Sequence, residues 1–232
     1  MHQAFISNPG LEVQVRAVGS DFVMFENALQ FIGAFVAFSI AMVAYKGVRE
    51  TSSSSMLRLA AAFVFLGTGF ALQGLGGTGL FAGIPALEVS VATILIAGMF
   101  LQTVGYFFLA FSHVLDVVVS RRLGPLLILF PIFAVSQMSV ETVLRSLSFF
   151  FILYGVLETG LSYGKTKNPT TLVITAGLGM LAAGWWVSLA APDFALLTLL
   201  QLLMREVGLV TLFIPVLRFS FRKPGEILNA PV

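Results

Sequence analysis

The stretch FALLTLLQLLMREVGLVTLFIPVLRF, residues 194–219, decides the fold of this chain. It is apolar over almost its whole length, and its interior carries charge only at Arg205 and Glu206. A helix that crosses the hydrocarbon core of a bilayer needs about 20 consecutive, mostly apolar residues. We therefore expect a membrane-spanning helix here, with two charged side chains near its middle.

The same apolar pattern recurs along the chain and predicts an all-α, polytopic membrane bundle of seven transmembrane helices. The expected spans are residues 22–45, 57–75, 89–119, 123–138, 140–163, 171–190 and 194–219. The fourth is the shortest, and it contains Pro125 and Pro131, which interrupt helices. The expected parts are an outer N-terminal segment at 1–21, the membrane domain at 22–219 and a short cytoplasmic tail at 220–232.

The composition of the whole chain excludes a soluble globular fold. Of its 232 residues, 58% are hydrophobic and 10% are charged, and the mean hydropathy is +0.97. Soluble domains are about 45–50% apolar and about 25% charged. The bilayer itself is therefore the first partner that the composition predicts.

Several kinds of chemistry are also excluded or disfavoured by composition. The chain has no cysteine, which excludes disulfides, cysteine-held metals and thiol catalysis, and it has only two histidines. The net charge of +2 does not indicate nucleic-acid binding. The sequence shows no HExxH motif and no serine-nucleophile motif paired with an intramembrane histidine. We expect no enzyme activity, no cofactor and no metal site.

The basic residues predict the orientation in the cell membrane. Lys and Arg collect in the cytoplasmic loops of membrane proteins. Ten of the 13 basic residues fall on one side of the expected spans: Lys46, Arg49, Arg58, Arg121, Arg122, Lys165, Lys167, Arg218, Arg222 and Lys223. With seven spans, this side is cytoplasmic and holds the C-terminus, and the N-terminus lies outside.

An internal repeat relates the first three expected helices to the last three. The matched residues keep their order, and both sets start on the outer side. We therefore predict parallel three-helix repeats about an axis along the membrane normal, with the fourth segment as linker. The matches include Glu26 with Glu141, Leu66 with Leu181, Gly69 with Gly184, Phe70 with Trp185, Gln102 with Arg205, and Gly105 with Gly208.

In this plan the chain resembles the seven-helix transporter, opsin and G-protein-coupled-receptor-like superfamily. SWEET sugar transporters share the three-one-three plan, and microbial rhodopsins share the helix number and orientation. Opsins carry a lysine inside the seventh helix that binds retinal as a Schiff base. Here all four lysines, at 46, 165, 167 and 223, lie at expected cytoplasmic ends. Covalently bound retinal is therefore not expected, and a non-covalent pigment or lipid stays open.

Polar residues inside the spans are the best indicators of function, because a charge at mid-bilayer costs about 2.5–3.5 kcal/mol on insertion scales. Arg205 comes 12 residues after Asp193, and Glu206 comes 12 residues before Arg218, which places both near the midplane. Gln102 has a similar depth in the third span.

These groups predict a ligand-binding site between the third, fifth and seventh helices. Gln201 lies one turn from Arg205 on the same helix face, and Glu158 is embedded seven residues before Lys165. We expect Arg205 to face the interior near Gln102 and Glu158, with Glu206 protonated or facing another helix. The alternatives are a buried network that only fixes helix packing, and a contact with another subunit.

Other polar and aromatic residues allow two interpretations each. Tyr106, Tyr154, Trp185 and Trp186 could wall a pocket, although the tryptophans fit an interfacial belt better. His113 and Asp116 could relay a proton, although a polar contact at the inner interface is the simpler interpretation. Glu26, Asn27 and Gln30 fit a solvated patch, and the paired glycines of the second and sixth spans predict close helix packing.

The function that follows is binding or transport of a small solute or proton through the buried polar site. One alternative is a sensory, receptor-like module that signals through a separate cytoplasmic protein. The other is an accessory subunit of a larger membrane complex. The sequence does not identify the solute.

Overall fold

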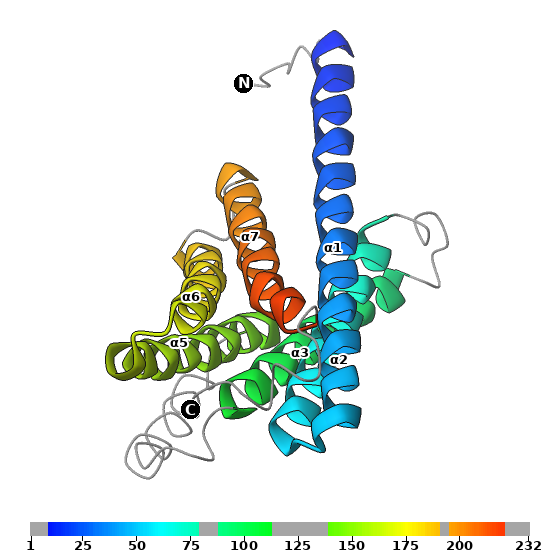
Figure 1. Ribbon diagram of the computed structural model, residues 1–232. Coiled ribbons are helices and arrows are strands. Elements are labelled where there is room, and N and C mark those ends of the chain that lie inside the picture. The colour runs from blue at the N-terminus through cyan, green and yellow to red at the C-terminus, as the bar shows by residue number, and fades with distance from the viewer. Residues whose placement is uncertain (1–8, 79–87, 113–138, 191–194, 221–232) are drawn as a thin grey trace.

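The computed structural model describes residues 9–78, 88–112, 139–190 and 195–220. In these ranges the fold is all-α, as predicted. Figure 1 shows the six helices, which are α1 (Pro9–Thr51), α2 (Ser54–Gly77), α3 (Glu88–Ser112), α5 (Val140–Thr166), α6 (Pro169–Ala190) and α7 (Ala195–Ser220). Each contains a segment long and apolar enough to cross a membrane. The helices therefore indicate an integral, multi-pass membrane protein.

The expected seven-helix architecture is not supported. The part of the chain that the structure describes holds six helices, so the resemblance to the seven-helix superfamily is wrong. The expected span at 123–138, and the end of the expected third span beyond Ser112, lie outside the described residues. Length and hydropathy select candidate spans, but prolines at 125 and 131 already made the fourth the weakest of them.

The first helix is longer than the sequence pattern predicted. It begins at Pro9 rather than near residue 22, and its membrane-length apolar part is Val23–Thr51. Proline favours the first turn of a helix because its φ is already helical. The first turns of α1 project beyond the other helices (Figure 1), so the segment at 1–21 is not separated from the first span by a helix break in the described residues.

The six helices close into a ring. Each packs against the next in the order α1, α2, α3, α5, α6, α7, and α7 packs against α1. The centre is filled by side chains with no exposed surface, among them Leu66, Phe70, Tyr106, Leu181 and Leu209. Large apolar side chains such as Phe35 and Met42 are exposed on the outside, where lipid would cover them.

Two of the ring contacts join helices that run in the same direction. Along α3 and α5, Thr103 contacts Ser148, Phe107 contacts Phe151 and Phe111 contacts Tyr154, so both residue numbers rise together. The pair α1 and α7 also runs side by side in one direction (Figure 1). These two contacts join the half α1–α3 to the half α5–α7.

Equivalent glycines make equivalent contacts in the two halves. A Cβ atom on Gly69 of α2 would lie 2.6 Å from the Gly98 carbonyl oxygen and 2.6 Å from Gln102 Cγ of α3. A Cβ atom on Gly184 of α6 would lie 2.8 Å from the Gln201 carbonyl oxygen and 2.8 Å from Arg205 Cγ of α7. The absence of a side chain therefore lets α2 approach α3, and α6 approach α7, at matching places.

A second set of matched contacts lies two turns further along α3 and α7. A Cβ atom on Gly105 would meet Leu66 and the Ala62 carbonyl oxygen, and one on Gly208 would meet Leu181 and the Gly177 carbonyl oxygen. The close packing predicted from the glycines of α2 and α6 is confirmed at Gly69, Gly177 and Gly184. Gly179 is the exception, because its Cβ would have no atom within 4 Å.

Gly69→Ala should lower the thermal midpoint of the purified protein. The new methyl group would overlap the backbone of α3, and overpacking of this kind costs about 1–3 kcal/mol. Gly179→Ala is the matched control on α6, where the methyl group meets open space and alanine favours the helix. The thermal midpoints are measured by tryptophan fluorescence during heating. Equal midpoints for the two variants would contradict this packing.

Candidate functional site

A polar cavity of about 470 Å³ lies inside the ring and is lined by all six helices. The N-terminal parts of α1, α3, α5 and α7 and the C-terminal parts of α2 and α6 form its wall, so it opens toward one end of the bundle. One lining residue from each helix is Gln30, Gln73, Met99, Arg145, Ser188 and Arg205. The site is thus shared by more helices than the third, fifth and seventh that the sequence suggested.

Arg205 lies at the inner end of this cavity and is 4% exposed. Its guanidinium carbon lies 4.9 Å from the ring centre of Phe70 and 4.5 Å from that of Trp185, so one aromatic ring from each half contacts the cation. A desolvated cation–π contact is worth about 2 kcal/mol. The rings therefore offset part of the cost of burying this charge, and they leave the edge of the guanidinium for polar partners.

A chain of amide side chains continues from Arg205 into the α2–α3 pair. Arg205 Nη2 donates to Gln102 Oε1 at 2.5 Å, and Gln102 Nε2 donates to Gln73 Oε1 at 3.0 Å. Gln102 has no exposed surface. These bonds fix the orientation of both the amide and the guanidinium.

Arg205 has no acidic partner in the described part of the chain. The ion pairs found there are Lys46 with Glu50 and Arg145 with Glu141. In addition, Arg205 Nε is buried and has no hydrogen-bond acceptor among the described residues. The inner end of the cavity therefore presents a cation whose charge no contacting carboxylate neutralises.

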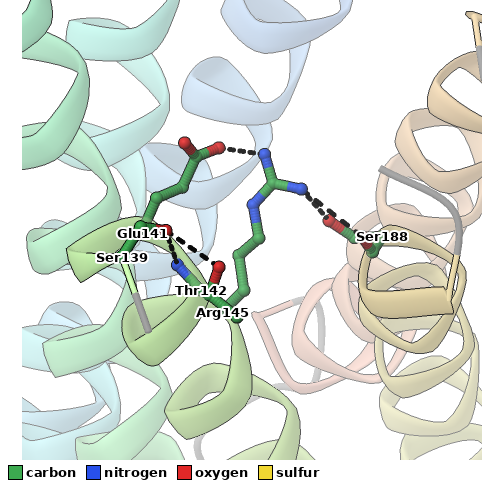
Figure 2. A network of polar contacts seen from close by, with 5 residues as sticks. All are labelled: Ser139, Glu141, Thr142, Arg145 and Ser188. Atoms are coloured by element: carbon green, nitrogen blue, oxygen red, sulfur yellow. Dashed lines mark hydrogen bonds and ion pairs between the residues drawn. The ribbon is translucent and has the colours of Figure 1, made fainter. Parts of the chain in front are cut away.

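The second arginine of the cavity, Arg145, has an acidic partner, although its Nε also lacks a hydrogen-bond partner among the described residues. Figure 2 shows Arg145 of α5 reaching between Glu141 on its own helix and Ser188 on α6. The spacing of four residues places Arg145 and Glu141 on one face of α5, where they form an ion pair. Ser139 caps the same helix end by accepting from the backbone N–H of Thr142 at 3.3 Å (Figure 2).

Glu206 faces away from this cation, toward α1. It is 6% exposed, and neither of its carboxyl oxygens has a hydrogen-bond partner among the described residues. A Cβ atom on Gly33 of α1 would lie 2.6 Å from Glu206 Oε1, so a larger residue there would require the carboxyl group to shift. Adjacent residues on a helix diverge by about 100°, which explains why Arg205 and Glu206 face different neighbours.

The matching contact between α3 and α5 is chemically different. Thr103 corresponds to Glu206 in the aligned halves, and its hydroxyl lies 2.9 Å from the Ser148 hydroxyl. Both of these side chains are neutral and hydrogen-bonded, whereas the carboxyl group of Glu206 has no hydrogen-bond partner among the described residues. The two contacts that join the halves therefore differ in charge and in hydrogen bonding.

A second cavity of about 260 Å³ lies toward the opposite end of the bundle. Its wall is almost entirely apolar and includes Val43, Phe63, Leu109, Leu178 and Leu212. Between the two cavities lie side chains without exposed surface, namely Leu66, Phe70, Tyr106, Leu181 and Leu209. The described bundle is therefore hollowed at both ends and closed in the middle.

The structure brings together some of the residues that the sequence singled out. Arg205 and Gln102 are bonded, and Gln201 lines the cavity. Tyr106 is fully buried and packs edge-on against Trp185, with ring centres 6.0 Å apart. These residues lie in or directly beneath the polar cavity.

Glu158 does not belong to this group. It does not line the polar cavity, and among the described residues it forms no ion pair with Arg205. Its position on α5 is more than three turns past Arg145, so it lies toward the other end of the helix. The expected proton-relay residues His113 and Asp116 lie outside the described residues.

Sequence reasoning misplaced several residues of the cavity. Asn27 and Gln30 were expected in a solvated patch, but both are buried and line the cavity with Gln73. Trp185 was expected at the membrane interface, but it is buried against Arg205, whereas Trp186 is exposed. The sequence signal that could have placed Trp185 beside Arg205 was its alignment with Phe70, because this match parallels the match of Gln102 with Arg205.

No family model, curated protein or solved structure matches this chain. In the described residues, no group of three or more His, Cys, Asp or Glu side chains is arranged to hold a metal ion. The cavity and the side chains that surround it are therefore the features of this chain that bear on its function.

Thr103→Val and Glu206→Gln should shift the thermal midpoint differently, although they change equivalent positions. Thr103→Val removes the hydrogen bond to Ser148 and should destabilise by about 1 kcal/mol. Glu206→Gln keeps the shape and removes the possibility of an unpaired buried charge, so the midpoint should stay or rise. A clear loss of stability in Glu206→Gln would show that the carboxyl group has a partner of its own.

Proposed function

We propose that this membrane protein binds a small anionic solute at Arg205 and carries it across the bilayer. The observation that carries the proposal is a buried guanidinium without a contacting carboxylate at the inner end of a polar cavity. A cation kept inside the membrane span is costly. An anionic group on a bound solute would supply the charge and the acceptor that Arg205 Nε lacks.

The arrangement of the two halves supports transport rather than binding alone. We propose that α1–α3 and α5–α7 are parallel repeats that move against each other at the α3–α5 and α1–α7 contacts. In this mechanism one conformational state opens the polar cavity at one end of the bundle. The apolar cavity at the other end marks where the helices separate when access changes sides.

We also propose that the N-terminus lies outside the cell and that the C-terminus is cytoplasmic. The support is the concentration of Lys and Arg at the ends of the helices remote from the polar cavity, including Lys46, Arg49 and Lys165. The polar cavity then opens to the outside. The function requires binding and movement of the solute, and no covalent chemistry.

The direct test of solute binding uses propionate as the anion. Titrated into the purified chain at constant ionic strength, it should raise the thermal midpoint, and Arg205→Gln should weaken its apparent affinity by at least about tenfold. The apparent affinity of Arg205→Lys should fall between that of the unsubstituted chain and that of Arg205→Gln. The reason is that an ammonium keeps the charge but lacks the planar face that contacts Phe70 and Trp185.

The controls for this test are sodium chloride at matched concentration and the variant Glu158→Gln, which lies outside the cavity. Uptake of labelled propionate into proteoliposomes separates transport from binding alone. Unchanged affinity in Arg205→Gln would overturn the assignment. Binding without uptake would favour a sensory role over transport.

Single cysteines test the orientation on a chain that has none of its own. Ser55→Cys and Val140→Cys place exposed thiols at opposite ends of the bundle. In intact cells, a membrane-impermeant maleimide should label Val140→Cys and should label Ser55→Cys only after the cells are opened. The reverse pattern would place the polar cavity on the cytoplasmic side.

A further inference from the structure

The polar cavity contains a second charged group without an ion-pair partner, and its sign is opposite to that of Arg205. Glu26 of α1 lines the cavity, and it takes part in neither of the ion pairs found in the described residues. Glu141 and Arg145, the other charged residues of the wall, neutralise each other. The net result is one negative group and one positive group in the same cavity, which attract each other across it without forming an ion pair.

The buried hydrogen-bonding groups of the cavity likewise include both donors and an acceptor that lack partners. Arg205 Nε is a buried donor without an acceptor, as are Arg145 Nε and Trp185 Nε1, and Gln30 Oε1 is a buried acceptor without a donor, within the described residues. Gln30 is 5% exposed and lines the cavity one turn from Glu26, on the same face of α1. A buried polar atom left without a partner costs about 1–3 kcal/mol. The cavity therefore lacks acceptors near its buried donors, Arg205 Nε among them, and one donor near Gln30.

The two unpaired groups lie at different depths. Gly33 of α1 faces Glu206, so it marks the level of the neighbouring Arg205, and Glu26 lies seven residues nearer the cavity mouth. This corresponds to a rise of about 10 Å along α1. The Arg205 side chain is expected to point toward the N-terminal end of α7, which is also the mouth, so the remaining gap is shorter.

We propose that the solute is a small zwitterion that carries one carboxylate and one ammonium group. This inference rests on the proposed function and specifies its substrate class. The carboxylate binds Arg205, and the ammonium group binds Glu26 and Gln30 Oε1. A simple monoanion would satisfy Arg205 alone, and it would leave the Glu26 side unpaired. A cavity of about 470 Å³ is within the usual range for small-molecule sites.

The test compares matched solutes on the full chain in detergent. Glycine, β-alanine and γ-aminobutyrate are zwitterions with increasing charge separation, propionate is the matched monoanion, and ethylammonium is the matched cation. At least one zwitterion should raise the thermal midpoint with an apparent affinity about tenfold or more above that of propionate. The member of the series that binds best reports the distance between the two charged groups.

Two variants separate this inference from the proposed function. Glu26→Gln should remove the preference for the zwitterion while binding of propionate persists, and Arg205→Gln should weaken both. Glu158→Gln should change neither. The zwitterion assignment is overturned if propionate binds as well as every zwitterion and Glu26→Gln has no effect. In that case the anion site at Arg205 still stands.

A different result would overturn both proposals. If none of the solutes containing a carboxylate shifts the midpoint, or if Arg205→Gln leaves all shifts unchanged, then Arg205 binds no anionic group. Circular dichroism of each variant, measured before titration, establishes that its helices are intact. A variant that has lost its helices is replaced by the milder Glu26→Asp or Arg205→Lys, for which the same order of affinities applies.

Discussion

The contact of the Arg205 guanidinium with Phe70 and Trp185 is the interaction on which the rest of the structure depends. It places a cation inside the ring, with one aromatic ring from each half of the chain against it. Gln102 then fixes the edge of the guanidinium through a hydrogen bond. Because aromatic faces and an amide replace a carboxylate here, the positive charge is accommodated without being neutralised, and it stays available to the cavity.

The resemblance between the halves explains how this position arises. The aromatic partners of Arg205 are Phe70 and its counterpart in the other half, Trp185. The hydrogen-bond partner, Gln102, occupies in the first half the position that Arg205 occupies in the second. Close approach of the helices at Gly69 and Gly184 brings the two aromatic residues and the Gln102–Arg205 pair to the centre of the ring. The halves differ in charge at these positions, so a nearly symmetric frame holds an asymmetric site.

Much of the fold could be predicted from the sequence, because the length of the apolar stretches and the spacing of the glycines are strong signals. The all-α class, the six described spans and the glycine contacts of α2 and α6 were all within reach. Six helices are described where seven were expected, and the expected fourth span at 123–138 lies outside the described residues. The contact of Arg205 with Gln102 was readable, but its contacts with Phe70 and Trp185 were not. Asn27, Gln30 and Trp185 could be placed only by knowing which helices meet.

The contact between α1 and α7 joins the two ends of the described chain. Pairing of distant segments generally forms late, because the intervening loop must first be closed. Helix α1 therefore stays in the bilayer without its α7 neighbour until α7 has been inserted. Gly33 would face lipid during that interval, whereas Asn27 would already be in contact with Gly77 of α2. Biogenesis of this protein should therefore be sensitive to how long the ribosome takes to deliver α7.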